Sequence, residues 1–339
     1  MDSSKENLSI QRWVVAIAIL LFAVKVLAYF LTYSVSILTD AIESTVNVVA
    51  GFIGLYSLYL SAKPSDVNHP YGHGKAEFLS ATVEGTLIFV AGIFIIVEAV
   101  SNLLHPQTIR QLDFGILLIA ITAVINFILG YVCIRKGRMN HSPALIASGK
   151  HLYTDSYSTL GIISGLAILY FTGLGWLDST IALLFAVIIL YTGYRIVRSS
   201  IAGIMDEADE KLIAKLVKLA DKQRRENWID LHNLRVIKYG SKLHIDCHLT
   251  VPWYLNVHEA HLEIEELVWL IRKEFGDAVE FFVHSDGCLD FQCSLCFKTN
   301  CNVRQKIFEK RIAWSAENVV SNKKHRLIGE EGMRMKIKN

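Results

Sequence analysis

Six long apolar segments, joined by short polar connections, occupy residues 11–202 of the chain. Each holds roughly 20 or more mostly apolar residues, the length that an α-helix needs to cross the hydrocarbon core of a bilayer. A soluble helical core would have to bury six such runs in series inside protein. We therefore expect a six-helix transmembrane bundle, with spans at residues 11–32, 35–62, 79–104, 112–135, 143–171 and 176–198.

The pattern changes after residue 202. Apolar positions then recur at helical spacing in two segments and alternate with polar positions in three others, as is typical of amphipathic helices and of strands. The order along the chain is helix 209–227, strand 231–240, strand 242–252, helix 256–276 and strand 278–286. This αββαβ order predicts a small ferredoxin-like α+β domain with both helices on one face of the sheet.

These patterns divide the chain into four parts. Residues 1–10 form a short segment on the cytoplasmic side, and residues 11–202 form the transmembrane domain. Residues 203–290 form the α+β domain, and residues 291–339 form a segment with cysteines and a basic tail.

Composition and charge support two regions in different solvents. The chain is 52% hydrophobic and 19% charged, with a mean hydropathy of +0.36, whereas a soluble protein carries about 25% charged residues. The connections on the side of both termini carry most positive charges, and the opposite side has Arg110. The positive charges on the side of the membrane that holds the termini are Lys5, Arg12, Lys63, Lys75, Arg135, Lys136, Arg138, Arg195 and Arg198. The positive-inside rule therefore predicts that both termini lie in the cytoplasm. We expect a multi-pass protein of the plasma (inner) membrane.

Two of the expected spans contain polar side chains that a membrane-crossing helix does not need. Glu43 and Asn47 are four residues apart in the second span, as are His151 and Asp155 in the fifth, so each pair shares a helix face. Ionisable groups at membrane depth cost roughly a few kcal/mol each and usually mark an ion or proton path. A single such residue would more often form a hydrogen bond between helices, but two pairs predict four ligands for a divalent cation. Asp40, one turn before Glu43, is either an outer partner of this site or a helix cap.

Three motifs carry a resemblance to a known family. They are "SVSILTDAIESTVNVV" at 34–49, "HPYGHGKAE" at 69–77 and "HLYTDSYSTLGIISG" at 151–165. In this order they resemble the cation diffusion facilitator family, whose members export divalent metals in exchange for protons. The resemblance covers residues from about 10 to 290 and implies six spans with a cytoplasmic C-terminal domain. It also implies a mid-membrane transport site formed by Glu43, Asn47, His151 and Asp155.

The first pair of this site departs from the family pattern. Zinc exporters of the family generally carry His or Asp followed by Asp, whereas Glu43 has a longer arm and Asn47 has no charge and cannot titrate. Amide and carboxylate oxygens favour Fe²⁺ or Mn²⁺, while His151 favours Zn²⁺ and its neighbours. We expect Zn²⁺ first, with Fe²⁺, Mn²⁺, Cd²⁺ and Co²⁺ as alternatives. Metal binds the deprotonated ligands, so metal and protons compete for one site, and alternating access turns this competition into antiport.

The loop "SDVNHPYGHGK" offers Asp66, His69 and His73 as ligands. Solvated histidines are the plain alternative, but the resemblance implies a further metal here, which we interpret as regulatory or stabilising rather than as a step on the path. The resemblance also implies an interlock between Lys75 and Asp206, at the junction of the membrane and cytoplasmic parts. At a water-accessible junction such a pair contributes about 1 kcal/mol or less.

The α+β domain contains many histidines for its size. Surface histidines explain some of them, but residues at matching positions in similar transporters form a binuclear zinc site that holds two domains together. The resemblance therefore implies a homodimer formed through this metal-binding domain. Its ligands would be His232, His248, His261, His284 and Asp286.

Four of the six cysteines lie close together in the sequence. They are Cys288, Cys293, Cys296 and Cys301, with the spacing C-x4-C-x2-C-x4-C. Disulfides are rare in a reducing cytoplasm, and clustered thiolates indicate zinc. Only one C-x2-C pair has the usual reach of zinc ligands, so an iron–sulfur cluster and unligated thiols stay open as alternatives. Cys133 and Cys247 are expected to be packing residues.

The tail, residues 302–339, carries ten Lys or Arg against four Asp or Glu. We expect it along the anionic inner leaflet or partly disordered, and it lacks the signatures of nucleic-acid binding.

The chain has no nucleophile–base arrangement and no nucleotide-binding loop, so we expect neither an enzyme nor an ATP-driven pump. The leading prediction is a secondary transporter that exports a divalent metal against protons. A membrane-anchored metal sensor or scaffold is the alternative, which leaves the two polar pairs in the membrane unexplained.

Overall fold

The computed structural model describes residues 3–32, 35–104, 113–172, 175–240, 242–276 and 279–327. The chain forms two compact units. The first comprises Met1–Met205 and Tyr239–Ser241, and the second comprises Asp206–Lys238 and Lys242–Asn339. Each unit has its own buried core.

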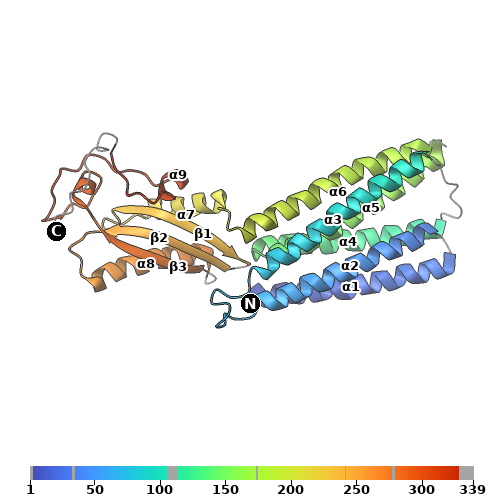
Figure 1. The fold of residues 1–339 in the computed structure, drawn as a ribbon, viewed down its shortest axis with the longest axis horizontal. Coiled ribbons are helices and arrows are strands. Elements are labelled where there is room, and N and C mark those ends of the chain that lie inside the picture. Colours follow the sequence, from blue (N-terminus) through green and yellow to red (C-terminus); the bar gives the residue numbers. More distant parts are fainter. Residues whose placement is uncertain are drawn as a thin grey trace. The chain divides into compact units, whose positions relative to one another are not determined.

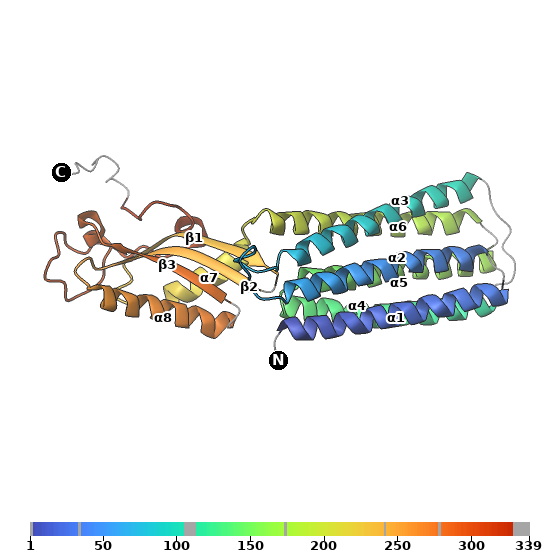
Figure 2. The same ribbon diagram turned by 60° about the horizontal axis from the view of Figure 1, so that its bottom comes forward.

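The first unit is a bundle of long helices (Figure 1). Within the described residues these are α1 (Ser3–Thr32), α2 (Val35–Ser61), α3 (Ala76–Leu104), α4 (Asp113–Met139), α5 (Pro143–Thr172) and α6 (Gly175–Ile204). Helix α1 packs on α2, α3 on α6 and α4 on α5, while α5 also contacts α2, α3 and α6 (Figure 2). The helical bundle confirms the prediction. Several helices extend past the expected apolar spans, because helical geometry continues through their polar ends.

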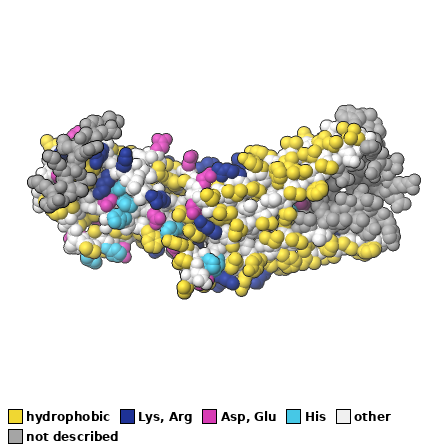
Figure 3. All heavy atoms as spheres, in the orientation of Figure 1, with side chains coloured by type: hydrophobic (Ala, Val, Ile, Leu, Met, Phe, Trp, Pro, Cys, Tyr) yellow, Lys and Arg dark blue, Asp and Glu magenta, His cyan; other side chains and the backbone are white. Residues whose placement is uncertain are grey.

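The surface of this unit suits a membrane. On the face shown in Figure 3, hydrophobic side chains cover the helices. Four described stretches are long and apolar enough to cross a bilayer, namely Lys5–Leu27, Ala76–Ser101, Ala120–Met139 and Ala186–Ile204. In α2 the described apolar stretch is the shorter Asn47–Ser61, and α5 has none among the described residues. These two helices carry the polar pairs.

The second unit is a three-stranded sheet with helices. Its elements are α7 (Glu210–Lys222), β1 (Asp230–Tyr239), β2 (Lys242–Val251), α8 (Val257–Phe275) and β3 (Val279–Gly287). They follow the predicted αββαβ order, and the strand order in the sheet is β1-β2-β3. Strands β2 and β3 are parallel, with His248 opposite His284 and Thr250 opposite Asp286. Only two residues join β1 to β2, a connection that antiparallel neighbours permit.

The two faces of the sheet differ in character. Leu243, Ile245 and Cys247 of β2 are buried in one core together with side chains of α7 and α8, and the two helices contact each other. Both helices therefore cover the same face of the sheet. Because side chains alternate along a strand, His244 and His248 point to the opposite face. The predicted cytoplasmic ligands on the strands gather there, away from the helices.

A left-handed residue adjusts β1 to this arrangement. Asn233 has a φ of 52°, a conformation that Asn adopts more readily than most other residues. It interrupts the alternation, so that Leu231 and Leu234, three positions apart, both enter the core. His232 is thereby left among the polar residues of the other face.

Helices α7 and α8 have clear boundaries. The side chain of Asp209 accepts from the backbone N–H of Leu212 at the start of α7. Asn256 and Glu259 form a capping box at the start of α8, and Gly276, with a φ of 85°, ends that helix.

The chain after β3 folds back onto the second unit. It contains the short 3-10 helix η1 (Asp290–Ser294) and the short α9 (Ala316–Val319). Trp314 and Val319 are buried in the core of this unit, and Arg311 pairs with Asp221 at 2.9 Å. The tail was expected to lie along the anionic inner leaflet or to be partly disordered; its Trp314 and Val319 instead contribute apolar side chains to the core of the second unit. Residues 328–339 lie outside the described part of the chain.

Candidate metal sites

The polar pair of α5 meets Asn47 of α2. Asn47 Nδ2 donates a hydrogen bond to Asp155 Oδ2 at 2.6 Å, and Asn47 Oδ1 lies 2.7 Å from His151 Nε2. His151 Nε2 also lies 3.9 Å from Asp155 Oδ1, and these two side chains are 10% and 13% exposed. The three residues form an almost enclosed polar group between the two helices.

The amide of Asn47 defines the protons in this group. It offers N–H to Asp155, which accepts as a carboxylate, and it offers its oxygen to His151, whose Nε2 therefore carries a hydrogen. The amide oxygen, the imidazole nitrogen and the carboxylate are donor atoms that bind divalent cations. The structure thus brings together three of the four residues predicted for the transport site.

Glu43 and Asp40 are the remaining residues of the predicted membrane site. Both belong to α2, and Glu43 lies one turn before Asn47. Their side chains lie outside the described part of the structure, so their parts in the site stay predictions.

A second polar cluster joins four helices close to His151, and the sequence pattern did not indicate it. Glu84 of α3 accepts a hydrogen bond from Ser148 of α5 at 3.0 Å. Gln11 of α1 donates to Ser148 Oγ and to the backbone oxygen of Gly51 in α2, both at 3.2 Å. Glu84 is 1% exposed, and its Oε2 has no hydrogen-bond partner among the described residues. Its partners come from other helices, so no local spacing could have revealed the cluster.

Gly54 allows these helices to approach. A Cβ at this position would lie 2.8 Å from Gln11 Nε2, 2.9 Å from Glu84 Oε1 and 3.2 Å from Ser148 Oγ. Such distances are shorter than side-chain packing accepts without a shift of neighbouring groups. The glycine is therefore needed for the polar cluster to close.

The loop between α2 and α3 brings Asp66, His69 and His73 together. Asp66 Oδ1 lies 3.2 Å from His69 Nδ1, and Asp66 Oδ2 lies 3.4 Å from His73 Nε2. The ring centroids of the two histidines are 4.3 Å apart. The backbone N–H groups of His69 and Asn68 donate to Asp66 Oδ1 and lower the pKa of this carboxyl, which keeps it ionised at neutral pH. The three side chains can each turn one ligand atom toward a shared ion.

The predicted interlock residues lie at the ends of α3 and α6. Lys75 precedes α3, and its Nζ donates to the backbone oxygen of Ile204, the last residue of α6, at 3.4 Å. Asp206 follows α6 in a left-handed conformation, with a φ of 57°. Lys75 and Asp206 belong to different units, so their pairing stays a prediction.

His232, His248 and Asp286 form a third group on the helix-free face of the sheet. Asp286 Oδ2 lies 3.3 Å from His232 Nε2 and 3.3 Å from His248 Nδ1. His284, opposite His248 in the neighbouring strand, has its ring centroid 4.7 Å from that of His248 and its Nε2 3.6 Å from Asp286 Oδ1. The structure therefore gathers four of the five residues predicted for the cytoplasmic site.

His261 lies apart from these four residues. It is exposed on α8, and its Nε2 lies 3.5 Å from Glu265 Oε1. Helix α8 covers the other face of the sheet, so the described structure does not bring His261 to the group. Its role as a ligand stays a prediction.

The electrostatics of the cytoplasmic group favour a neutral His232. Burial lowers the pKa of His232, although the nearby carboxylates of Asp230 and Asp286 oppose the shift. Neutral imidazole is the form that binds a metal ion. His232 Nδ1 lies 3.6 Å from Asp230 Oδ2, so a carboxylate stands behind the ring, as is usual for metal-binding histidines.

Asp230 is in turn held by His325, and the sequence pattern indicated neither residue. Burial opposes ionisation of Asp230, but hydrogen bonds from the ring and the backbone N–H of His325 outweigh it and lower the pKa of this carboxyl. The backbone bond measures 3.0 Å. His325 lies 95 positions further along the chain, so no local motif could have linked the two.

The same sheet face carries a second histidine with two carboxylates, which was also missed. His244 Nε2 lies 3.4 Å from Asp246 Oδ1, and His244 Nδ1 lies 3.5 Å from Glu280 Oε2. The alternation of "KLHIDCHLTV" places His244, Asp246 and His248 on one face. That pattern was sufficient to find the group.

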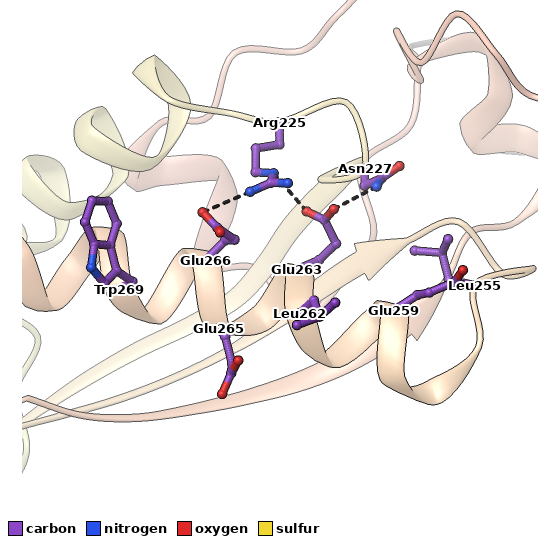
Figure 4. Close-up of a pocket in the computed structure, with 9 residues that line it drawn as sticks. All are labelled: Arg225, Asn227, Leu255, Glu259, Leu262, Glu263, Glu265, Glu266 and Trp269. Atoms are coloured by element: carbon purple, nitrogen blue, oxygen red, sulfur yellow. Dashed lines mark hydrogen bonds and ion pairs between the residues drawn. The ribbon is translucent and has the colours of Figure 1, made fainter.

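A hollow of about 560 Å³ lies along α8 (Figure 4). The carboxylates that line it already have partners. Arg225 forms ion pairs with Glu263 at 3.2 Å and Glu266 at 2.9 Å, and Asn227 donates a hydrogen bond to Glu263 at 2.8 Å. None of the predicted ligands lines this hollow.

Comparisons with known proteins cover most of the chain. Residues 12–205 match the model of the cation efflux transmembrane domain, and residues 208–288 match that of the cation efflux protein cytoplasmic domain. The chain is 34% identical over 244 residues to an uncharacterized transporter of Synechocystis sp., which covers 72% of this chain and 79% of the relative. It is 30% identical over 278 residues to the cation-efflux pump FieF of Pectobacterium atrosepticum, which covers 80% of this chain and 89% of the relative. Residues after 288 lie outside both family models.

Proposed function

Because the chain belongs to the cation diffusion facilitator family, we propose that it exports a divalent metal cation from the cytoplasm in exchange for protons. The transported ion that we propose first is Zn²⁺, ahead of Fe²⁺, Mn²⁺, Cd²⁺ and Co²⁺. The relative from Pectobacterium atrosepticum is named a cation-efflux pump, which supports metal export.

The observation that carries this proposal is the meeting of Asn47 with His151 and Asp155. These residues join α2 and α5 at the depth where polar groups are costly, and they present two oxygen ligands and one nitrogen ligand to one another. Glu43, one turn along α2, is the fourth ligand that we propose. Hydrogen bonds between helices account for single polar residues in a bundle, whereas a set of oxygen and nitrogen ligands drawn from two helices supports a site for a transported ion.

The coupling to protons follows from His151. In the observed arrangement Nε2 carries a hydrogen that faces Asn47 Oδ1. A neutral ring can move this hydrogen to Nδ1 when a metal ion takes Nε2, so a net proton is released only from a doubly protonated ring or from a protonated carboxyl group of the site, the forms with which the metal competes. Protons from the other side of the membrane then restore the bond to Asn47 and expel the ion.

The other metal groups have supporting roles in this proposal. Asp66, His69 and His73 lie in a loop outside the helices, where a bound ion would regulate or stabilise rather than be transported. His232, His248, His284 and Asp286 hold metal at the contact of two cytoplasmic domains in a homodimer. The distribution of Lys and Arg supports termini in the cytoplasm, and the bilayer that we propose is the plasma (inner) membrane. We propose no enzymatic activity and no nucleic-acid partner.

The test is metal uptake by the purified protein in liposomes that contain a zinc-sensitive dye and a pH-sensitive dye. An acidic lumen should accelerate Zn²⁺ uptake several-fold, and the lumen should become less acidic as Zn²⁺ enters. Zn²⁺ uptake at the same rate with and without the pH gradient would exclude antiport. Metal binding without any flux would instead favour the membrane-anchored sensor.

A further inference from the structure

The segment after β3 arranges four thiols around one small hollow. Its lining includes Cys288, Cys293, Cys296 and Cys301, together with Arg304 and Lys298. The hollow measures about 20 Å³, enough for one water-sized ion. Four of the six cysteines of the chain therefore line one hollow and are close in space as well as in sequence.

Backbone hydrogen bonds fix this segment. The N–H of Cys288 donates to the oxygen of Val251 at 2.9 Å, which ties the segment to the end of β2. The guanidinium of Arg304 closes the loop by donating to three backbone oxygens, those of Cys293 (2.9 Å), Cys296 (3.1 Å) and Lys298 (2.5 Å). These hydrogen bonds give the loop that carries the thiols a defined conformation.

The sulfur atoms have hydrogen-bond donors of the kind that support thiolates. The backbone N–H groups of Trp253 and Lys298 favour the thiolate forms of Cys288 and Cys296, respectively, and oppose the rise that burial causes in the pKa of these thiols. Outer donors like these orient the ligands of metal sites and stabilise their charge.

Two cations balance the charge that such a site would carry. A divalent ion with four thiolates has a net charge of about −2. Arg304 and Lys298 both line the hollow. Lys298 Nζ is held by Asn227 Oδ1 at 2.9 Å, and Asn227 is held by Glu263 of α8 (Figure 4).

Other uses of these thiols fit less well. All four cysteines are free, so they do not form disulfides in the structure. Cys133 and Cys247, by contrast, are each buried in an apolar core, where a thiol serves only as packing.

The thiols stand somewhat wider apart than in a loaded site. Among the described residues, no three sulfurs of this cluster lie within 4.8 Å of one another. Tetrahedral zinc with four thiolates sets neighbouring sulfurs about 3.8 Å apart. The loop therefore has to close by an ångström or more around an ion, and the small hollow leaves it the room to do so.

We propose that Cys288, Cys293, Cys296 and Cys301 bind one Zn²⁺ in a tetrahedral thiolate site. Cys288 is the last residue matched by the family models, and the other three ligands lie beyond it, so the site belongs to the extension of this chain. The ion would hold residues 288–304 together at the end of β2. Its first ligand, Cys288, lies two positions after Asp286 in the sequence. The site is independent of the transport site, and its test needs no transport.

Co²⁺ titration of the purified, metal-free full-length protein tests the proposal, because only sulfur ligands give the thiolate-to-Co²⁺ charge-transfer absorption. The other candidate metal groups contain no cysteine and stay silent. We expect the absorption to saturate at one Co²⁺ per chain and to disappear when Zn²⁺ is added. Cys293→Ser and Cys296→Ser should each weaken Co²⁺ binding at this site at least tenfold, whereas Cys133→Ser should keep the full absorption.

Absence of the absorption in the wild-type protein would overturn the proposal without recourse to any variant. Survival of the absorption at full strength in Cys293→Ser would overturn it as well. Iron with acid-labile sulfide in the protein as purified would replace the zinc site by an iron–sulfur cluster.

Discussion

Asn47 on α2 donates a hydrogen bond of 2.6 Å to Asp155 on α5, across 108 positions of sequence. This bond joins the two helices that carry the polar pairs. The group that faces Asp155 is thus the neutral amide of Asn47, whereas an aspartate at position 47 would place a second carboxylate beside Asp155. The residue at position 47 therefore affects the net charge of the proposed transport site.

Asn47→Asp should change both the affinity for metal and its dependence on pH. Two carboxylates within hydrogen-bond distance share a proton near neutral pH, and a bound dication would displace that proton. At pH 8 we expect the Zn²⁺ concentration for half-maximal uptake to fall about tenfold, which corresponds to about 1.4 kcal/mol. At pH 6 the gain should shrink. Uptake into liposomes at both pH values, over a panel of Zn²⁺, Fe²⁺, Mn²⁺, Cd²⁺ and Co²⁺, measures the effect.

Asn47→Gln is the matched control, because it keeps the amide and adds no charge. It should not steepen the pH dependence. An equal gain of Asn47→Asp at pH 6 and at pH 8 would show that residue 47 takes no part in proton competition.

Gly54→Ala should destabilise the helical bundle. Its Cβ would press on Gln11 and Glu84, and overpacking of this kind costs about 1–3 kcal/mol. Gly51→Ala, one turn away on the same helix, meets Val15 Cγ2 at 3.2 Å and should cost less. Thermal unfolding in detergent compares the two variants, and equal midpoints would mean that the cluster around Glu84 does not constrain the packing of the helices.

The stability of the metal-free protein should fall in acid because of His232. Burial holds the pKa of His232 below its ordinary value near 6.5. In the unfolded chain the ring gains a proton as the pH falls through about 6.5, while in the folded chain it stays neutral to lower pH. The unfolded state then binds more protons, so stability that is present above pH 6.5 is lost below it.

His232→Gln removes this source of acid sensitivity. Between pH 7 and pH 5.5, the unfolding midpoint of the wild-type protein should fall more than that of the variant, both treated with chelator. His261→Gln, on the exposed surface of α8, should retain the slope of the wild type. Parallel slopes for all three proteins would contradict a buried, neutral His232.

Much of the fold could be predicted because its signals are local. The length of an apolar run indicates a membrane helix, and alternation indicates a strand, so the helical bundle and the αββαβ order followed from the sequence. The spacing of His151 and Asp155 likewise placed both on one face of α5. The direction of the amide of Asn47, which defines the protons, needed the packing of α2 on α5.

The contacts that escaped prediction join segments far apart in sequence. Glu84 is bound by residues of other helices, and Asp230 by His325 near the end of the described chain. Trp314 and Val319 were hidden in a segment whose charge suggested a free tail, because charge dominates composition while two apolar residues suffice to anchor a segment. His244, by contrast, was predictable from a local signal, since strand alternation already placed it beside His248.

Zn²⁺ uptake by Asp155→Asn, measured in proteoliposomes together with Zn²⁺ binding in detergent, tests the central claim most directly. The amide keeps the size of the side chain but removes its charge, so uptake should drop at least a hundredfold and one Zn²⁺ per chain should be lost. Asp290→Asn, an exposed aspartate of η1, should transport and bind as the wild type does. Transport by Asp155→Asn at the wild-type rate would show that the ion crosses the membrane without meeting α2 and α5 at this site.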